Sequence, residues 1–158
     1  MYVYKMYCVD TKVRVRYAET DQMGFVYYGV YAQYYEVGRV ELLRSLGLSY
    51  SKIEDLGFFL PVVNLVVNYK KSAFYDNKLN IHTTIKEIPR SKITFFYEIF
   101  NEANELLNEG STTLVFMKKK TKKICTAPNI LIERLFEKFH WLDIFSNTKS
   151  IKLDIVWL

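Results

Sequence analysis

Asp21 is the residue best suited to chemistry in this sequence. It lies in the segment RYAETDQMGFVYYGVY, residues 16–31, together with two glycines and four tyrosines. A carboxylate can attack an acyl carbon or activate a water molecule, and aromatic neighbours such as Phe25 would partly shield it from solvent. The alternative interpretation is that Asp21 only shapes a turn in TDQMG. Spacing alone leaves both interpretations open.

The segment that holds Asp21 joins an expected strand to an expected helix. Alternating valines predict the strand over Cys8–Arg16, and an apolar face at helical spacing predicts the helix over Tyr31–Leu46. The first N–H groups of a helix have no partner within it, and the helix dipole favours negative charge beside them. We therefore expect amides near Gly29 to stabilise an oxyanion on a substrate carbonyl. Gly29 would also let a ligand approach the backbone closely.

Shorter patterns complete the expected set of elements. Gly47 ends the long helix, and SYSKIEDLG predicts a short second helix capped by Ser49 or Ser51. After Gly57 the apolar period changes to that of strands, which predicts four of them, and residues 129–139 predict a closing helix. The inward residues expected in the four strands are Phe59, Val63, Leu65, Val67 and Tyr69; Leu79, Ile81, Thr83 and Ile85; Ile93, Phe95, Tyr97 and Ile99; and Leu114 and Phe116.

This order of elements predicts an α+β fold in which one antiparallel sheet wraps around one long central helix. A chain of 158 residues is most simply a single domain, with a core over about 8–138 and a tail over 139–158. Apolar residues alternate between 151 and 157, so the tail could add an edge strand or lie on the surface. No function follows for the tail.

Charge and motif content argue against several common functions. The net charge is only +5, and the run Lys118–Lys123 has no interleaved aromatic residues, so no nucleic-acid partner is expected. The sequence has no GxSxG motif and no glycine-rich phosphate loop. His82 falls on the polar face of an expected strand and His140 falls in the tail, so histidine-based catalysis has little support. A carboxylate is the remaining candidate for acid–base or nucleophilic chemistry.

Cysteine usage and hydropathy indicate the compartment. Cys8 and Cys125 lie far apart and lack the spacing of metal ligands, so no metal site is expected and free thiols are the default. Neither a signal peptide nor a transmembrane segment is recognised. We therefore expect a cytoplasmic protein.

Glu36 and Arg39 lie one helical turn apart on the predicted long helix. Because Arg39 falls within the apolar arc, a buried or interfacial ion pair is the main interpretation. The alternative is that Glu36 is the catalytic acid.

Four segments form a pattern that is more specific than any single motif. They are RVRYAETDQMGFVYYGVYAQYYEVGRVELLRSLGLSY at 14–50, LPVV at 60–63, NYKKSAFYDNKLNI at 68–81 and GSTTLVFMKKKT at 110–121. Together they resemble the hotdog-fold acyl-CoA thioesterases, most closely their 4-hydroxybenzoyl-CoA thioesterase and YbgC-like branch. The resemblance covers most of the chain, and it implies a hotdog fold.

The resemblance also implies roles for particular residues. Asp21 matches the catalytic aspartate, which acts as nucleophile or general base on a thioester. The amides near Tyr28 and Gly29 match the helix start that polarises the carbonyl, and Tyr27 and Tyr31 match aromatic positions that line the acyl site. The family forms homodimers, often homotetramers, with active sites at the subunit boundary, and it uses no metal or separate cofactor. Two positions depart from the family pattern: many relatives have histidine in place of Tyr28, and asparagine is common in place of Val30.

Basic residues near two adjacent strand ends provide a second expected site. Arg90, Ser91 and Lys118 could together clamp the phosphates of coenzyme A, and the resemblance supports Arg90 and Ser91 most. The alternative is a solvated basic edge that prevents strand-to-strand aggregation.

These observations lead to two functional hypotheses. The main one is an acyl-CoA thioesterase that releases CoA and a carboxylic acid. The rival is a non-hydrolytic protein that binds acyl thioesters or an acyl-carrier protein, which the departures at Tyr28 and Val30 favour.

Overall fold

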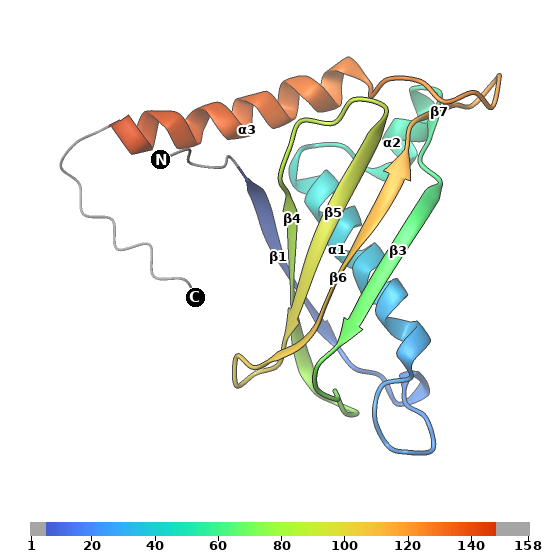
Figure 1. Ribbon diagram of the computed structural model, residues 1–158, viewed down its shortest axis with the longest axis vertical. Coiled ribbons are helices and arrows are strands. Elements are labelled where there is room, and N and C mark those ends of the chain that lie inside the picture. The colour runs from blue at the N-terminus through green and yellow to red at the C-terminus, as the bar shows by residue number, and fades with distance from the viewer. Residues whose placement is uncertain (1–5, 148–158) are drawn as a thin grey trace.

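The computed structural model describes residues 6–147, with side chains up to residue 139. Five antiparallel strands form one sheet in the spatial order β1-β4-β5-β6-β3, and β2 pairs with β7 in a second, two-stranded sheet. Figure 1 shows the arrangement of these elements. Their bounds are β1 (Tyr7–Arg14), η1 (Tyr17–Glu19), η2 (Tyr28–Val30), α1 (Tyr31–Ser45), α2 (Tyr50–Asp55), β2 (Phe58–Phe59), β3 (Val62–Tyr69), β4 (Lys78–Ile85), β5 (Lys92–Phe100), β6 (Leu106–Val115), β7 (Met117–Lys118) and α3 (Asn129–Asn147).

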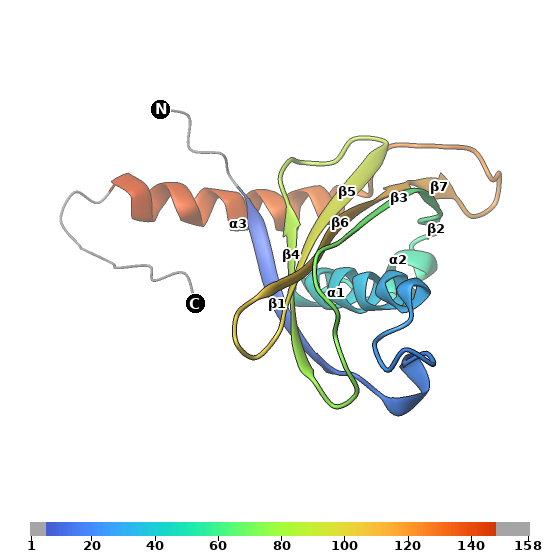
Figure 2. The ribbon, with the colours of Figure 1, turned by 60° about the horizontal axis from the view of Figure 1, so that its bottom comes forward.

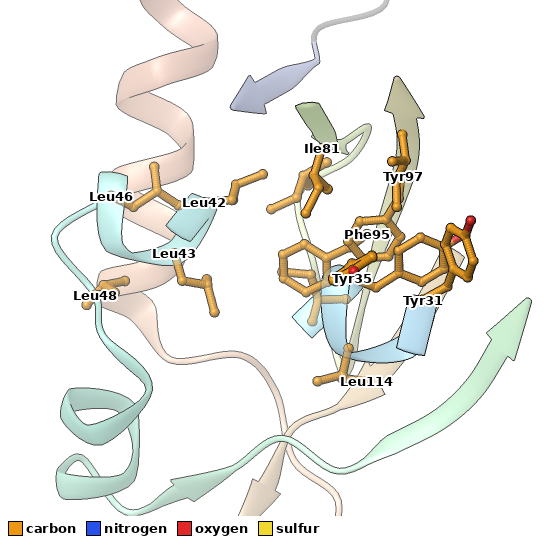
Figure 3. Close-up of a cluster of buried hydrophobic side chains, with 14 of the residues drawn as sticks. Tyr31, Tyr35, Leu42, Leu43, Leu46, Leu48, Ile81, Phe95, Tyr97 and Leu114 are labelled. Atoms are coloured by element: carbon orange, nitrogen blue, oxygen red, sulfur yellow. The ribbon is translucent and has the colours of Figure 1, made fainter. Parts of the chain in front are cut away.

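The long helix α1 packs against one face of the sheet, which curves around it (Figures 1 and 2). Apolar side chains of α1 meet those of the strands in the buried core of Figure 3. Gly38 allows the close approach of α1 to β4, because a Cβ at this position would overlap Thr83 Oγ1. The inward residues predicted for β4, β5 and β6 are all buried. The predicted α+β architecture, an antiparallel sheet around a central helix, is therefore confirmed.

The end of α1 follows its sequence signals. Gly47 has a φ of +73°, and the N–H of Leu48 donates to the carbonyl of Leu43 at 3.0 Å, which closes the helix with a left-handed residue. Ser49 then caps α2, since its side chain accepts a hydrogen bond from the N–H of Lys52 at 3.2 Å. Of the two predicted caps, Ser49 is the correct one.

The inward face expected for the strand after Gly57 is wrong. Phe59 belongs to β2, and in β3 the side chains of Val63 and Leu65 are 58% and 45% exposed. Only Val67 packs partly against the core. The reason is that β3 is an edge strand: alternation reports which side chains share a face, whereas burial requires another layer over that face. The outcome is an apolar, exposed sheet edge.

The closing helix is longer than predicted. The sequence pattern ends it at residue 139, but α3 continues to Asn147, so the first part of the expected tail is helical. Leu131, Leu135 and Phe139 are buried, and α3 contacts β1. The alternating segment between 151 and 157 lies outside the described residues. Within 6–147, no helix is both long and apolar enough to cross a membrane.

Candidate active site

A cavity of about 250 Å³ opens where the loop after β1, the start of α1 and the end of β3 meet. The loop contributes Asp21, the helix start contributes Tyr28 and Tyr31, and β3 contributes Tyr69. The structure thus brings together three of the residues singled out in the sequence, Asp21, Tyr28 and Tyr31. The full lining is Asp21, Met23, Phe25, Val26, Tyr28, Tyr31, Tyr69, Lys70, Lys71 and Ser72.

The start of the helix presents unpaired backbone donors. The short helix η2 runs directly into α1, because Val30 already has helical dihedral angles of −69° and −27°. The N–H groups of Tyr28 and Gly29 precede the first helical hydrogen bond, which the N–H of Val30 donates to Tyr27 at 2.9 Å. Neither of them donates to another backbone group within residues 6–147. Such donors can hold a developing oxyanion.

Asp21 both shapes a turn and lines the cavity. Its Oδ1 accepts a hydrogen bond from the N–H of Met23 at 2.8 Å, and its carbonyl accepts one from the N–H of Gly24 at 3.0 Å. Gly24 has a φ of +84°, a conformation that favours glycine. Among the described hydrogen bonds, none engages Oδ2 of Asp21. Asp21 thus does shape a turn, as the alternative interpretation expected, but only one of its carboxylate oxygens is used for this. The other oxygen is left for a ligand.

Aromatic rings surround the helix start. Tyr31 packs edge-to-face on Tyr69 with centroids 5.4 Å apart, and the Tyr69 hydroxyl donates to the carbonyl of Tyr28 at 3.0 Å. Burial raises the pKa of Tyr31. Tyr27 does not line the cavity, although its ring centroid lies 4.4 Å from that of Tyr28. A Cβ on Gly29 would lie 2.8 Å from Cε1 of Tyr27, so a larger residue here would displace the exposed Tyr27 ring.

A buried carboxylate, Glu19, anchors the loop that carries Asp21. Its oxygens accept hydrogen bonds from the backbone N–H of Arg16 at 2.8 Å, from the Arg16 guanidinium at 2.9 and 2.6 Å, and from the hydroxyl of Tyr34 at 2.8 Å. Burial by itself would raise the pKa of Glu19, but the hydrogen bonds and the charge of Arg16 outweigh it and hold the pKa below its usual range. Sequence reasoning missed Glu19, because its partner Tyr34 lies on a different element.

The cavity also contains residues from the segment between β3 and β4 that the sequence analysis gave no role. These are Lys70, Lys71 and Ser72. Lys70 and Lys71 are ion-paired, with Glu109 at 2.9 Å and Glu105 at 2.5 Å. These residues belong to the segment 68–81, which contributed to the family resemblance. The sequence did not indicate that this segment folds beside Asp21.

Arg90 and Ser91 directly precede β5, and Lys118 ends β7. The start of β5 and β7 lie at the end of the sheet opposite to the loop between β1 and α1 (Figure 1). The predicted adjacency of the strand ends is present, since the carbonyl of Ser91 accepts the N–H of Phe116 at 3.0 Å. Lys118 belongs to a basic turn, residues 117–124, that we name the lysine hairpin. Its Nζ lies 4.0 Å from the ring centroid of Phe58. The fold of a single chain therefore does not bring these residues to Asp21.

The expected ion pair between Glu36 and Arg39 is present, with Oε2 and Nη2 3.7 Å apart. Arg39 is buried and also donates from Nε to the Tyr50 hydroxyl at 3.0 Å. The Glu36 side chain is 64% exposed and does not line the Asp21 cavity. In the described part of the chain, no group of three or more His, Cys, Asp or Glu side chains could hold a metal ion.

Known proteins agree with this architecture. The model of the thioesterase-like superfamily matches residues 15–135. The acyl-CoA thioester hydrolase YbgC of Escherichia coli is 31% identical over 120 residues, which cover 76% of this chain and 90% of that protein. A Bacillus subtilis protein provisionally named acyl-CoA thioesterase YneP is 37% identical over 118 residues, covering 75% of this chain and 86% of that protein.

Solved structures give the same result. The crystal structure of a DHNA-CoA thioesterase from Staphylococcus aureus has a TM-score of 0.77 at 38% identity, and covers 91% of this chain and 96% of that one. The chain therefore belongs to the thioesterase-like superfamily and has its hotdog fold. The predicted resemblance and the prediction of a thioester hydrolase are confirmed.

Proposed function

We propose that this protein hydrolyses an acyl-CoA thioester to coenzyme A and a carboxylic acid with Asp21 as nucleophile or general base. The observation that carries the proposal is the single cavity lined by both the Asp21 carboxylate and the start of the central helix. A thioester bound there would lie between Asp21 and the Tyr28 end of the helix, whose amides we assign as oxyanion donors, although Gly29 itself does not line the cavity. This is the arrangement that attack on a carbonyl requires.

Two routes lead to the same products. With Asp21 as general base, its carboxylate takes a proton from water while the water oxygen attacks the thioester carbon. With Asp21 as nucleophile, its oxygen forms a mixed anhydride that water then hydrolyses. In both routes the N–H groups of Tyr28 and Gly29 hold the oxyanion, and the thiolate of coenzyme A leaves and is protonated.

A homodimer formed through the exposed edge strand β3 would complete this site. Val62, Val63, Leu65 and Val66 expose apolar surface along an edge that has no covering layer within residues 6–147. Two identical edge strands related by a two-fold axis run antiparallel, so the Val62 end of one lies beside the Tyr69 end of the other. The lysine hairpin of the second copy would then approach the cavity of the first. Further pairing into a homotetramer is a separate prediction.

The basic residues at that end of the sheet would bind the substrate's phosphates. Arg90, Ser91 and Lys118 are our candidates, with Tyr27 and Tyr31 beside the acyl group. Phosphate oxygens of coenzyme A are strong acceptors that pair well with arginine and lysine donors. Cross-linking and light scattering would test the dimer. We also propose a cytoplasmic location, which suits a CoA ester as substrate, and cell fractionation would test it.

Thiol release from a panel of short, long and aromatic acyl-CoAs tests the proposed reaction. We expect release with at least one class of substrate and loss of release in Asp21→Asn. The rival function is non-hydrolytic binding of an acyl thioester or of acyl-carrier protein. It is favoured by Tyr28, whose phenol cannot take up a proton as a histidine would. Binding of acyl-CoA without release from any member of the panel would support the rival.

A further inference from the structure

Glu19 is a buried charge that the proposed reaction does not use. Its exposed fraction is 7%, and it does not line the Asp21 cavity. A buried carboxylate is costly unless its oxygens are fully hydrogen-bonded, and those of Glu19 are, through Arg16 and Tyr34. A residue with this many fixed partners is suited to hold a loop in one geometry.

The partners of Glu19 belong to both halves of the candidate site. Its backbone carbonyl accepts the N–H of Tyr27 at 2.9 Å, and Tyr27 directly precedes the first free amide, that of Tyr28. Its carboxylate holds Tyr34, one turn into α1. Asp21 follows Glu19 by two residues in the sequence. One residue therefore ties the loop with the carboxylate to the helix with the amide donors.

The neighbouring contacts close the same loop. Thr20 and Val26 form an isolated antiparallel bridge, and the N–H of Asp21 donates to the carbonyl of Phe25 at 3.1 Å. The loop is also held to the segment before β4, because the N–H of Val26 donates to the carbonyl of Ala73 at 2.8 Å and Phe25 forms a bridge with Phe74. Among the described side-chain hydrogen bonds of residues 19–21, however, only the one between Glu19 and the Tyr34 hydroxyl joins the loop to α1.

We propose that Glu19 is a positioning residue that fixes the separation between the Asp21 carboxylate and the amides of Tyr28 and Gly29. Its kinetic consequence rests on the proposed thioesterase function. Small misplacements of reacting groups lower rates strongly, by about 100-fold for an ångström. Because Glu19 does not contact the cavity, its loss should affect the chemical step more than substrate binding.

Glu19→Gln tests this proposal with little change in shape. The glutamine keeps the backbone carbonyl, but its NH₂ group would face donors where the carboxylate accepts hydrogen bonds. We expect kcat to fall by about 10- to 100-fold with KM for acyl-CoA within about 2-fold of the wild type. Tyr34→Phe removes only one of the hydrogen bonds, so a smaller fall in kcat, of about 3- to 10-fold, is expected.

Asp76→Asn is the matched control. Asp76 pairs with Arg14 at 3.0 Å at the same end of the sheet, does not line the cavity, and has a φ of +67° that asparagine tolerates. We expect this variant to keep the wild-type kcat and KM. An equal fall in kcat in Glu19→Gln and Asp76→Asn would show that Glu19 contributes only to overall stability, and it would overturn the proposal.

Amide hydrogen exchange provides a readout that needs no activity. In folded Glu19→Gln, or in Tyr34→Phe if the first variant does not fold, residues 20–28 should exchange faster than in the wild type while the sheet amides do not change. Unchanged exchange in this loop would overturn the positioning role. The wild type could hydrolyse no acyl-CoA while residues 20–28 still exchange faster in the variant. In that case the proposed function is wrong, but the anchoring of the loop by Glu19 is supported.

Discussion

The two ends of the sheet hold their charges in different ways. At the end with the Asp21 cavity four cations are ion-paired: Arg14 with Asp76, Arg16 with Glu19, Lys70 with Glu109 and Lys71 with Glu105. At the opposite end, Lys118 and Lys122 lie 4.0 and 4.1 Å from the ring centroids of Phe58 and Phe59. Within residues 6–147, no ion pair involves the lysines of the lysine hairpin.

This difference separates two uses of charge. An exposed ion pair adds only about 0–1 kcal/mol to stability, but it restricts where its side chains lie. A lysine over an aromatic ring is held in place while its charge is not neutralised, so it continues to attract anions. The cations named at the cavity end are thus neutralised and restricted by ion pairs, whereas those of the lysine hairpin keep their charge, which supports the phosphate-binding role that we propose for it.

The strongest test of the cavity end is Asp21→Asn. The amide can neither take a proton nor attack, so kcat for acyl-CoA hydrolysis should fall by about 100- to 10,000-fold with little loss of thermal stability. Stopped-flow or thiol-release kinetics would measure it. Glu36→Gln is the control, because it removes a carboxylate from α1 that lies outside the cavity. If only Glu36→Gln abolished hydrolysis, our assignment of Asp21 would be wrong.

The lysine hairpin should affect substrate binding rather than the chemical step. In the triple variant Lys118→Gln, Lys119→Gln, Lys122→Gln, we expect KM for acyl-CoA to rise about 10-fold at low salt while kcat changes little. The difference from the wild type should shrink as ionic strength increases. Steady-state kinetics between low and high salt would measure both effects.

A matched control removes the same number of charges elsewhere. Lys12→Gln, Lys86→Gln and Lys138→Gln together lower the net charge equally, from exposed positions on β1, after β4 and on α3. We expect this control to keep the wild-type KM. An equal rise in KM in both triple variants would show that only the overall charge matters, and the comparison between the two ends would lose its functional meaning.

Tyr69→Phe should have a smaller effect at the cavity end. It removes the hydroxyl that donates to the carbonyl of Tyr28 at 3.0 Å, a bond worth about 0.5–1.5 kcal/mol. We expect kcat to fall by about 2- to 5-fold and Tm to fall slightly. Tyr75→Phe, which alters another exposed tyrosine outside the cavity, should leave both unchanged. A wild-type kcat in Tyr69→Phe would mean that the helix start does not depend on this bond.

The outer face of the sheet provides the mildest test of charge pairing. His82 Nδ1 lies 2.9 Å from Asp10 Oδ1, and interactions with Cys8 and Asp10 raise the pKa of His82 to about 9. A raised pKa means that the stabilisation is fully present below about pH 6.5, the unfolded value, and is lost as pH rises through 9. The Tm difference between the wild type and His82→Gln should therefore disappear above pH 9.

NMR can follow the same group directly. The His82 imidazole signals should titrate near pH 9 in the wild type, and at lower pH in Cys8→Ala and in Asp10→Asn. Titration near pH 6.5 in the wild type would contradict the pairing, because that is the value of an isolated histidine.

Local patterns were sufficient for most of the fold. The 3.6-residue period located α1 to within a residue, Gly47 and Ser49 marked the boundary between two helices, and strict alternation identified the buried faces of β4 and β5. These features depend on neighbours within a few residues. The edge strand β3 and the extent of α3 were mistaken, because burial and helix length there depend on layers that a local pattern does not contain.

The candidate site likewise has features that local sequence determines and features that depend on the tertiary structure. The sequence by itself determined that Asp21 lies in a loop before a glycine-led helix start, since residue type, turn chemistry and helix signals are local. Only the tertiary structure decided that Tyr69, Lys70 and Lys71 fold beside Asp21, that Glu19 ties the loop to Tyr34, and that the lysine hairpin lies at the far end. The physical reason is strand pairing: the antiparallel register of β3 with β6 and the packing of α1 bring distant segments together, and no spacing along the chain encodes those contacts.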